Sequence, residues 1–137
     1  MVLFLAASEV AGTTAAAQAA SPYGKKAVAV AASKHGAPYA LGATGPNSFD
    51  CSGLTLYAFR KVGHRLPRTA DQQYKQTRRI PPVRRAPGDL VFFPQGNTMG
   101  HVGIYAGREK IWHAPRPGGR VRLERIWSKN VRYGRTP

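Results

Sequence analysis

The pair Pro81-Pro82 separates two parts of the chain whose hydrophobic patterns differ, and this change limits the fold more than any other feature. Before it, apolar residues recur at helical spacing, which predicts three helices near 22–35, 51–62 and 70–77. After it, short apolar runs alternate with Gly, Pro and charged turns, which predicts antiparallel strands at 90–93, 101–106, 111–114 and 121–123. Helices followed by strands indicate the α+β class rather than alternating βαβ units.

Capping signals set the expected bounds of the helices. Ser21 followed by Pro22 is typical of an N-cap and first helical position, and Gly36 of a helix end. Thr69 and Gln72 have the spacing of a capping box, which predicts that the short third helix begins there.

The length of 137 residues predicts a single domain, which we place at 21–137. Residues 1–20 end in Ala17-Gln18-Ala19, an A-x-A pattern typical of a secretory signal peptide, although a basic N-terminal region is missing. We therefore expect 1–20 to be the remnant of a secretion signal or a flexible lead. No apolar run reaches the roughly 18 residues of a membrane span, so we expect none.

The charge balance favours an anionic partner. The chain has 21 Lys and Arg against 6 Asp and Glu, a formal net charge of +15. Such a field attracts nucleic acid, anionic lipid surfaces or the acidic polymers of a cell wall. Because the sequence has no helix–turn–helix or zinc-finger signal, we expect no specific nucleic-acid binding.

The single cysteine, Cys51, lies where a glycine-rich loop meets the second expected helix. Free N–H groups and the helix dipole at that end stabilise a thiolate, so we expect a lowered thiol pKa and a nucleophile. The same N–H groups could bind an oxyanion. The alternative is a buried structural cysteine.

Two histidines on neighbouring expected strands could serve such a nucleophile. His101 opens one strand after a glycine-containing loop, and His113 lies on the next. A turn at 107–110 would bring the two rings within about two residues of register, roughly 7 Å or less. One ring would then take the thiol proton while the other orients it.

The other two histidines, His35 and His64, each neighbour a glycine at an expected helix end, where a cation stabilises the dipole. The four histidines show no metal-binding spacing, and no acidic residue is paired with them in the sequence. We therefore predict no metal and no cofactor.

An ordered set of short motifs resembles the NlpC family, the papain-like cysteine peptidases of bacterial cell walls. The resemblance covers roughly residues 24–126. The motifs are Gly36-Ala37-Pro38-Tyr39, Gly42, Phe49-Asp50-Cys51-Ser52-Gly53-Leu54, Leu66-Pro67-Arg68-Thr69, Pro87-Gly88-Asp89-Leu90-Val91-Phe92-Phe93, Gly100-His101-Val102-Gly103-Ile104-Tyr105 and His113-Ala114.

The resemblance implies a papain-like α+β fold in which the nucleophile helix packs on an antiparallel sheet. It implies an endopeptidase that hydrolyses peptidoglycan stem peptides, usually between D-γ-glutamate and the diamino acid. Cys51 matches the family nucleophile, His101 its base and His113 the orienting residue. The same resemblance implies that the substrate-binding residues are Tyr39, Asp50 and Ser52.

The chain departs from the family pattern just after Tyr39. Leu41 stands where the family commonly has Trp, and Gly42-Ala43 follows where Gly-Gly is frequent. This departure bears on substrate preference rather than on the chemistry.

Two other functions fit the same residues. A papain-like amidase or acyltransferase would use the same dyad, because the dyad does not dictate which amide is cut. A non-catalytic binder of anionic wall polymer would use the charge alone. For the endopeptidase we expect a secreted, wall-associated monomer that binds wall polymer through its basic surface.

Overall fold

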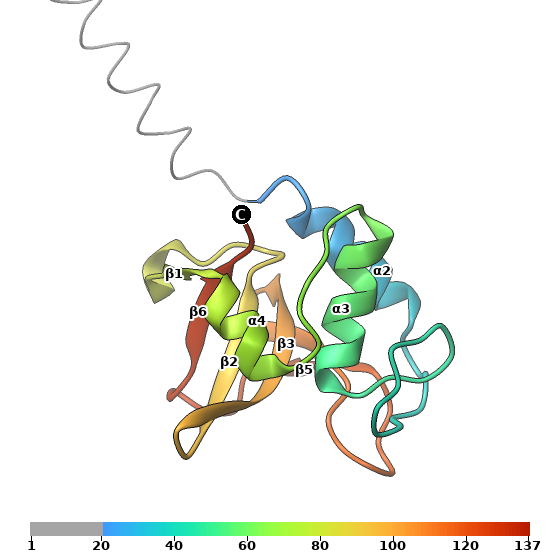
Figure 1. The fold of residues 1–137 in the computed structure, drawn as a ribbon. Coiled ribbons are helices and arrows are strands. Elements are labelled where there is room, and N and C mark those ends of the chain that lie inside the picture. Colours follow the sequence, from blue (N-terminus) through green and yellow to red (C-terminus); the bar gives the residue numbers. More distant parts are fainter. Residues whose placement is uncertain (1–20) are drawn as a thin grey trace, which may run out of the picture.

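The computed structural model describes residues 21–137, in which three α-helices precede a six-stranded antiparallel sheet (Figure 1). The helices are α2 (Gly24–Ser33), α3 (Cys51–Lys61) and α4 (Ala70–Gln76). The remaining elements are β1 (Arg78–Ile80), the 3-10 helix η1 (Pro82–Arg84), β2 (Leu90–Gln95), β3 (Thr98–Gly107), β4 (Lys110–His113), β5 (Arg122–Arg125) and β6 (Arg132–Arg135). The expected α+β order, with helices first, is confirmed.

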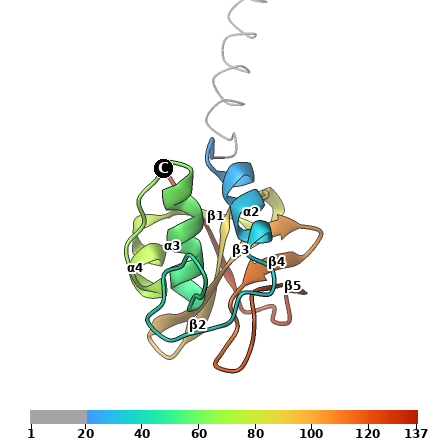
Figure 2. The ribbon, with the colours of Figure 1, turned by 90° about the vertical axis from the view of Figure 1, so that its right-hand side faces the viewer.

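The strands are arranged in the order β1-β6-β2-β3-β4-β5, so the longest strand, β3, lies inside the sheet. All three helices contact β3 and lie on one side of the sheet (Figures 1 and 2). This arrangement brings the start of α3 next to the middle of β3, where the two predicted parts of the site meet.

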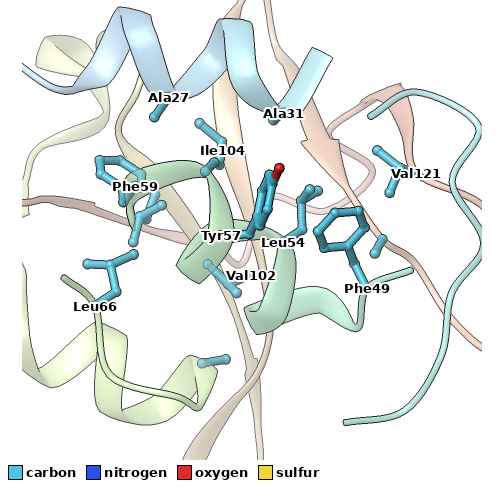
Figure 3. Close-up of a cluster of buried hydrophobic side chains, with 14 of the residues drawn as sticks. Ala27, Ala31, Phe49, Leu54, Tyr57, Phe59, Leu66, Val102, Ile104 and Val121 are labelled. Carbon is cyan, nitrogen blue, oxygen red and sulfur yellow. The ribbon is translucent and has the colours of Figure 1, made fainter. Parts of the chain in front are cut away.

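The main core fills the space between the helices and the sheet. Leu54 and Phe59 of α3 pack against Val102 and Ile104 of β3, and Ala27 of the neighbouring helix α2 belongs to the same cluster (Figure 3). All five side chains are fully buried. Truncating a large side chain in such a core to Ala costs about 2–5 kcal/mol, so this packing fixes the position of α3 on the sheet.

A second, smaller cluster covers the opposite face of the sheet. Val91, Phe93, Tyr105, Ile111 and Tyr133 are buried there, under the segment that links the last two strands. His101 and His113 occupy the same side as Phe93 and Ile111, because side chains alternate along a strand and residues two apart share a face.

The helix bounds agree with two of the three sequence expectations. Helix α3 begins at Cys51, and α4 is preceded by Thr69 in a complete capping box with Gln72. The expected start of the first helix is wrong. Helix α2 begins at Gly24, and the hydroxyl of Ser21 instead lies 3.0 Å from that of Thr136, which ties the two ends of the described chain together.

The sequence pattern misses two strands, β1 and β6. Both are rich in arginine, so neither shows the apolar run that marks the other strands. The expectation for residues 1–20 falls outside the described residues. None of the helices in the described part of the chain is long and apolar enough to cross a membrane.

Candidate active site

Cys51 is the first residue of α3, and its position is set by the residue before it. Asp50 has extended backbone, and its carboxylate accepts a hydrogen bond from the N–H of Gly53 at 2.7 Å, which makes it the N-cap. The second carboxylate oxygen accepts from the N–H of Gly42 at 2.9 Å. The glycine-rich loop is therefore bound to the start of α3.

Gly53 allows this loop to approach closely. A Cβ atom at Gly53 would lie 2.0 Å from the carbonyl oxygen of Ala43, closer than any real contact. The Ala43 oxygen also accepts from the N–H of Asp50 at 2.9 Å. A larger residue at 53 would push the loop away from Cys51.

The electrostatics of Cys51 differ from the sequence expectation. Burial raises the pKa of its thiol, and the neighbouring carboxylate of Asp50 raises it further. Hydrogen bonds from the backbone N–H groups of Ser52 and Val102 oppose this rise without cancelling it. The expected lowering of the pKa by the helix end is therefore wrong for the free protein, because burial outweighs the helix amides.

The contact with Val102 also locates the sulfur, since Val102 directly follows His101 on β3. His101 does not open its strand as expected, because β3 begins three residues earlier, at Thr98. The ladder is irregular beside it. Phe93 pairs with His101 but Pro94 pairs with Met99, which leaves Gly100 as an extra residue. Such bulges re-aim side chains next to active sites.

His101 and His113 are in direct contact, as the expected register of their strands predicts. Nε2 of His101 lies 2.8 Å from Nδ1 of His113. The strands pair through Ile104 with Trp112 and Tyr105 with Ile111, which places the two histidines two residues out of register. Because Nε2 of His101 bonds His113, Nδ1 is the ring nitrogen of His101 that this contact leaves free.

A carboxylate completes this row of side chains. Nε2 of His113 lies 2.8 Å from a carboxylate oxygen of Glu124 on β5, and Arg122 donates to the same oxygen at 3.0 Å. The expectation that no acidic residue is paired with the histidines is wrong. Glu124 approaches His113 diagonally across the β4–β5 ladder, a relation that only the register reveals.

Both histidines favour the neutral form. Burial and the neighbouring His113 lower the pKa of His101 to about 4, against a smaller opposing effect of Glu124. Burial also lowers the pKa of His113, although its hydrogen bond with Glu124 acts in the opposite direction. His101 is thus an uncharged base near neutral pH.

A pocket of about 390 Å³ opens beside the histidines, lined by Gly100, His101, His113, Pro115, Arg116, Glu124 and Trp127. Trp127 forms one wall. Its ring stacks on Phe93 at 4.4 Å between centroids and lies 5.3 Å from the ring of His113, yet 54% of the residue is exposed. Trp127 is not among the expected site residues, because this residue lies between two strands and outside every motif.

The three residues matched to substrate binding lie close to Cys51: Asp50 and Ser52 are its neighbours in the chain, and the charge of Cys51 acts on Tyr39. Burial raises the pKa of the Tyr39 hydroxyl, and the charges of Cys51 and Asp50 raise it further, so this group faces the site. Asp50 and Ser52 are both buried and share one partner, Arg68. Arg68 lies 2.5 Å from a carboxylate oxygen of Asp50 and donates to the Ser52 hydroxyl at 2.9 Å.

Arg68 is not among the expected site residues, although it stands in the motif Leu66-Pro67-Arg68-Thr69. Burial tends to raise the pKa of the Asp50 carboxyl, but hydrogen bonds from Arg68, Gly53 and Gly42 bring it below its usual value. The carboxylate is therefore ionised near neutral pH, and it already accepts hydrogen bonds from Arg68, Gly53, Gly42 and the hydroxyl of Ser52.

The remaining histidines pack elsewhere. The ring of His64 stacks on Tyr23 at 4.7 Å, its Nε2 is buried without a hydrogen-bond partner, and burial lowers its pKa. The expected role of His64 as a cation at a helix end is therefore wrong. His35 lies near the end of α2, with its ring 5.6 Å from that of Trp112.

Comparisons with known proteins agree with this geometry. The sequence model of the NlpC/P60 family matches residues 36–134. The chain is 46% identical over 110 residues to a "probable endopeptidase p60" of Listeria monocytogenes, covering 76% of this chain and 22% of that protein. It is 43% identical over 83 residues to the "bifunctional muramidase/DL-endopeptidase CwlT" of Bacillus subtilis, covering 58% of this chain and 25% of that protein.

Among solved structures, the peptidoglycan hydrolase RipB of Mycobacterium tuberculosis superposes with a TM-score of 0.74 at 29% identity, covering 82% of this chain and 64% of that one. The chain spans about a quarter of the length of the two curated relatives. The papain-like α+β fold expected from the motifs is confirmed by such matches. On the extent of the family match and the order of the motifs within it, the chain belongs to the NlpC/P60 family.

Proposed function

We propose that this chain is a cysteine endopeptidase that cleaves the stem peptides of peptidoglycan. The observation that carries the proposal is the placement of Cys51 at the start of α3, with its sulfur on the backbone beside His101, whose far nitrogen bonds His113. A nucleophile, a base and a group that orients the base are what acyl transfer by a thiol requires.

The reaction would follow from these positions. The sulfur of Cys51 attacks the carbonyl carbon of the scissile amide as Nδ1 of His101 takes its proton. The N–H groups of Cys51 and Ser52 at the helix start face the oxyanion that forms. His101 then gives the proton to the leaving amine, which leaves an acyl-enzyme, and water releases the acyl group by the same base.

The bond between D-γ-glutamate and the diamino acid is the proposed site of cleavage. The name of the Bacillus subtilis relative, a DL-endopeptidase, supports this choice over a glycan-proximal amide. Asp50 and Ser52 are the chain neighbours of Cys51, which supports a role in holding the free amine end of the stem peptide, and Tyr39 would line the site near the cysteine. Arg68 would share that surface, because it binds both Asp50 and Ser52.

The test is the mass of the products. Purified protein and a Cys51→Ala variant are incubated with muropeptides, and the products are measured by mass spectrometry. We expect stems split within the peptide by the wild type alone. Whole stems freed from glycan would indicate an amidase instead, and identical products from the wild type and Cys51→Ala would refute cysteine catalysis.

We also propose that the basic surface binds anionic wall polymer outside the cell. The net charge of +15 supports this, because carboxylates and phosphates of the wall would satisfy such a field. Binding to isolated sacculi should weaken as salt rises, since exposed charges are screened. Retention that stays constant up to molar salt would contradict an electrostatic anchor. N-terminal sequencing of secreted material tests the proposed export.

A further inference from the structure

Glu124 is the charged side chain at the end of the histidine row, and neither the motifs nor the family match assigns it a role. One of its carboxylate oxygens, Oε1, is 2.8 Å from Nε2 of His113, and Nε and a terminal nitrogen of Arg122 lie 3.0 and 2.9 Å from the same atom. The His113 side chain is only 1% exposed, whereas that of Glu124 is 34% exposed. A buried imidazole is thus bound to a carboxylate that faces the pocket.

The carboxylate dictates where His113 carries its proton. Although partial burial opposes ionisation, hydrogen bonds from His113 and Arg122 hold the pKa of Glu124 below its usual value. An ionised carboxylate only accepts hydrogen bonds. Nε2 of His113 must therefore donate, and because a neutral imidazole has one N–H, its Nδ1 is unprotonated and accepts.

The proton position on His113 in turn determines the proton position on His101. Nδ1 of His113 can accept only from Nε2 of His101, 2.8 Å away. Nε2 of His101 then holds the single proton of a neutral ring, and Nδ1 has the free electron pair. With the roles reversed, His113 would donate from Nδ1, and His101 would carry its proton on Nδ1, where it could not accept one from a thiol.

The geometry points to Glu124 as a positioning residue that fixes the proton arrangement of both histidines, so that Nδ1 of His101 is the unprotonated base facing Cys51. The inference deepens the proposed function and rests on it. During attack the proton of the Cys51 sulfur moves to Nδ1 and from there to the leaving amine. The protons on Nε2 of both rings stay in place, and the charge formed on His101 is stabilised by the carboxylate beyond His113.

Removing the carboxylate should let the reversed, inactive arrangement compete. Partners that hold a metal-bound imidazole typically contribute about 10–100-fold to metal affinity or activity, and we apply the same range to this ring. We expect kcat of Glu124→Ala to fall by that factor with KM changed less than about twofold, because Glu124 holds a ring rather than the substrate. Glu124→Gln should retain more activity than the alanine variant, because its amide oxygen can accept from His113 while its amide nitrogen can also donate.

The deciding measurement needs no substrate. Nitrogen-15 NMR of the imidazole rings in the free protein reports which nitrogen carries each proton. In the wild type we expect His101 and His113 both protonated on Nε2, and in Glu124→Ala a shift toward protonation on Nδ1. Glu109→Gln is the matched control, since it makes the same chemical change in an exposed ion pair with Arg85 and should alter neither spectrum nor kcat.

A wild-type spectrum with His101 protonated on Nδ1 would overturn the inference, as would unchanged imidazole signals and unchanged kcat in Glu124→Ala. The wild-type spectrum decides the proton arrangement even if the alanine variant fails to fold, and Glu124→Gln, which has the size of the native side chain, still tests the effect on kcat. If muropeptides are not cleaved at all, the proposed function fails, but the imidazole spectra still confirm or refute the role of Glu124.

Discussion

Before substrate binds, Cys51 and His101 should both be uncharged at neutral pH. Burial and then the carboxylate of Asp50 raise the pKa of the thiol above its ordinary value of 9.0. Burial and then His113 lower the pKa of His101 from 6.5 to about 4. The sequence alone favours a thiolate paired with an imidazolium, and the structure reverses that expectation.

The size of the effect follows from the His101 value. With a pKa of about 4, about one ring in a thousand is protonated at pH 7. The change from 6.5 corresponds to about 3 kcal/mol in favour of the neutral ring. The proton therefore moves during attack rather than before it. Activity should fall as pH drops through about 4, where the base becomes protonated, and again above the raised pKa of the thiol, where the proton needed by the leaving amine is lost.

Alkylation of Cys51 by iodoacetamide distinguishes a neutral thiol and imidazole from a thiolate–imidazolium pair. We expect the rate to rise steadily with pH as the thiol ionises, in the wild type and in His101→Ala alike. At pH 7 the two rates should differ less than about threefold, whereas removing the base should cost at least about 100-fold in turnover. His35→Ala, away from the pocket, serves as the control and should match the wild type.

One outcome would refute this reasoning. If wild-type alkylation is fast and independent of pH from weakly acid to neutral conditions, and if His101→Ala abolishes that plateau, then the thiolate–imidazolium pair exists in the free protein. The burial of the two groups would then not control their charge.

Three further changes test other parts of the site. His113→Ala should lower turnover while leaving some, and His113→Gln should retain more because it keeps a hydrogen-bonding group; steady-state kinetics on muropeptides would show the order. Gly53→Ala should lower the free energy of unfolding by about 1–3 kcal/mol, measured by denaturant titration, because its Cβ would meet the backbone oxygen of Ala43 at 2.0 Å. The pKa of His101 is 6.5 in the unfolded chain and about 4 in the folded protein, so the unfolded chain takes up this proton first as pH falls. The contribution of His101 to the free energy of unfolding is therefore fully present above pH 6.5 and falls by up to about 3 kcal/mol toward pH 4. The same titration on His101→Gln should show a smaller loss, and an equal loss would contradict the assignment.

The proximity of Cys51, His101 and His113 could be predicted because each of the three has a local signal. Cys51 stands at a loop–helix junction, and the helix does begin there. His101 and His113 lie on strands joined by a short turn, and a short turn largely determines the register of its two strands. The 2.8 Å contact between the two rings follows from that register.

The parts that were missed depend on contacts between distant residues. Glu124 meets His113 only because β5 pairs with β4, and no motif marks the pairing. Strand β6 reads as charged sequence, yet Arg135 is buried because it binds the carboxylate of Asp89, 46 residues away. Ser21 has the character of a helix cap but bonds Thr136 instead. In each case a tertiary partner overrides the local preference.

In a chain of net charge +15, three of the few carboxylates support the residues of the candidate site. Asp50 caps the helix of Cys51, and Asp71 accepts from the N–H of Met99 at 3.0 Å, two residues before His101. Glu124 holds His113. Each of the three also binds a basic side chain, and each has a pKa below its usual value despite an opposing effect of burial. Protonation weakens the hydrogen bonds that a carboxylate accepts. The contacts of Asp50, Asp71 and Glu124 should therefore weaken together as pH falls below the ordinary carboxyl range. A small acidic set in a basic chain thus positions the start of α3, the part of β3 next to His101, and His113.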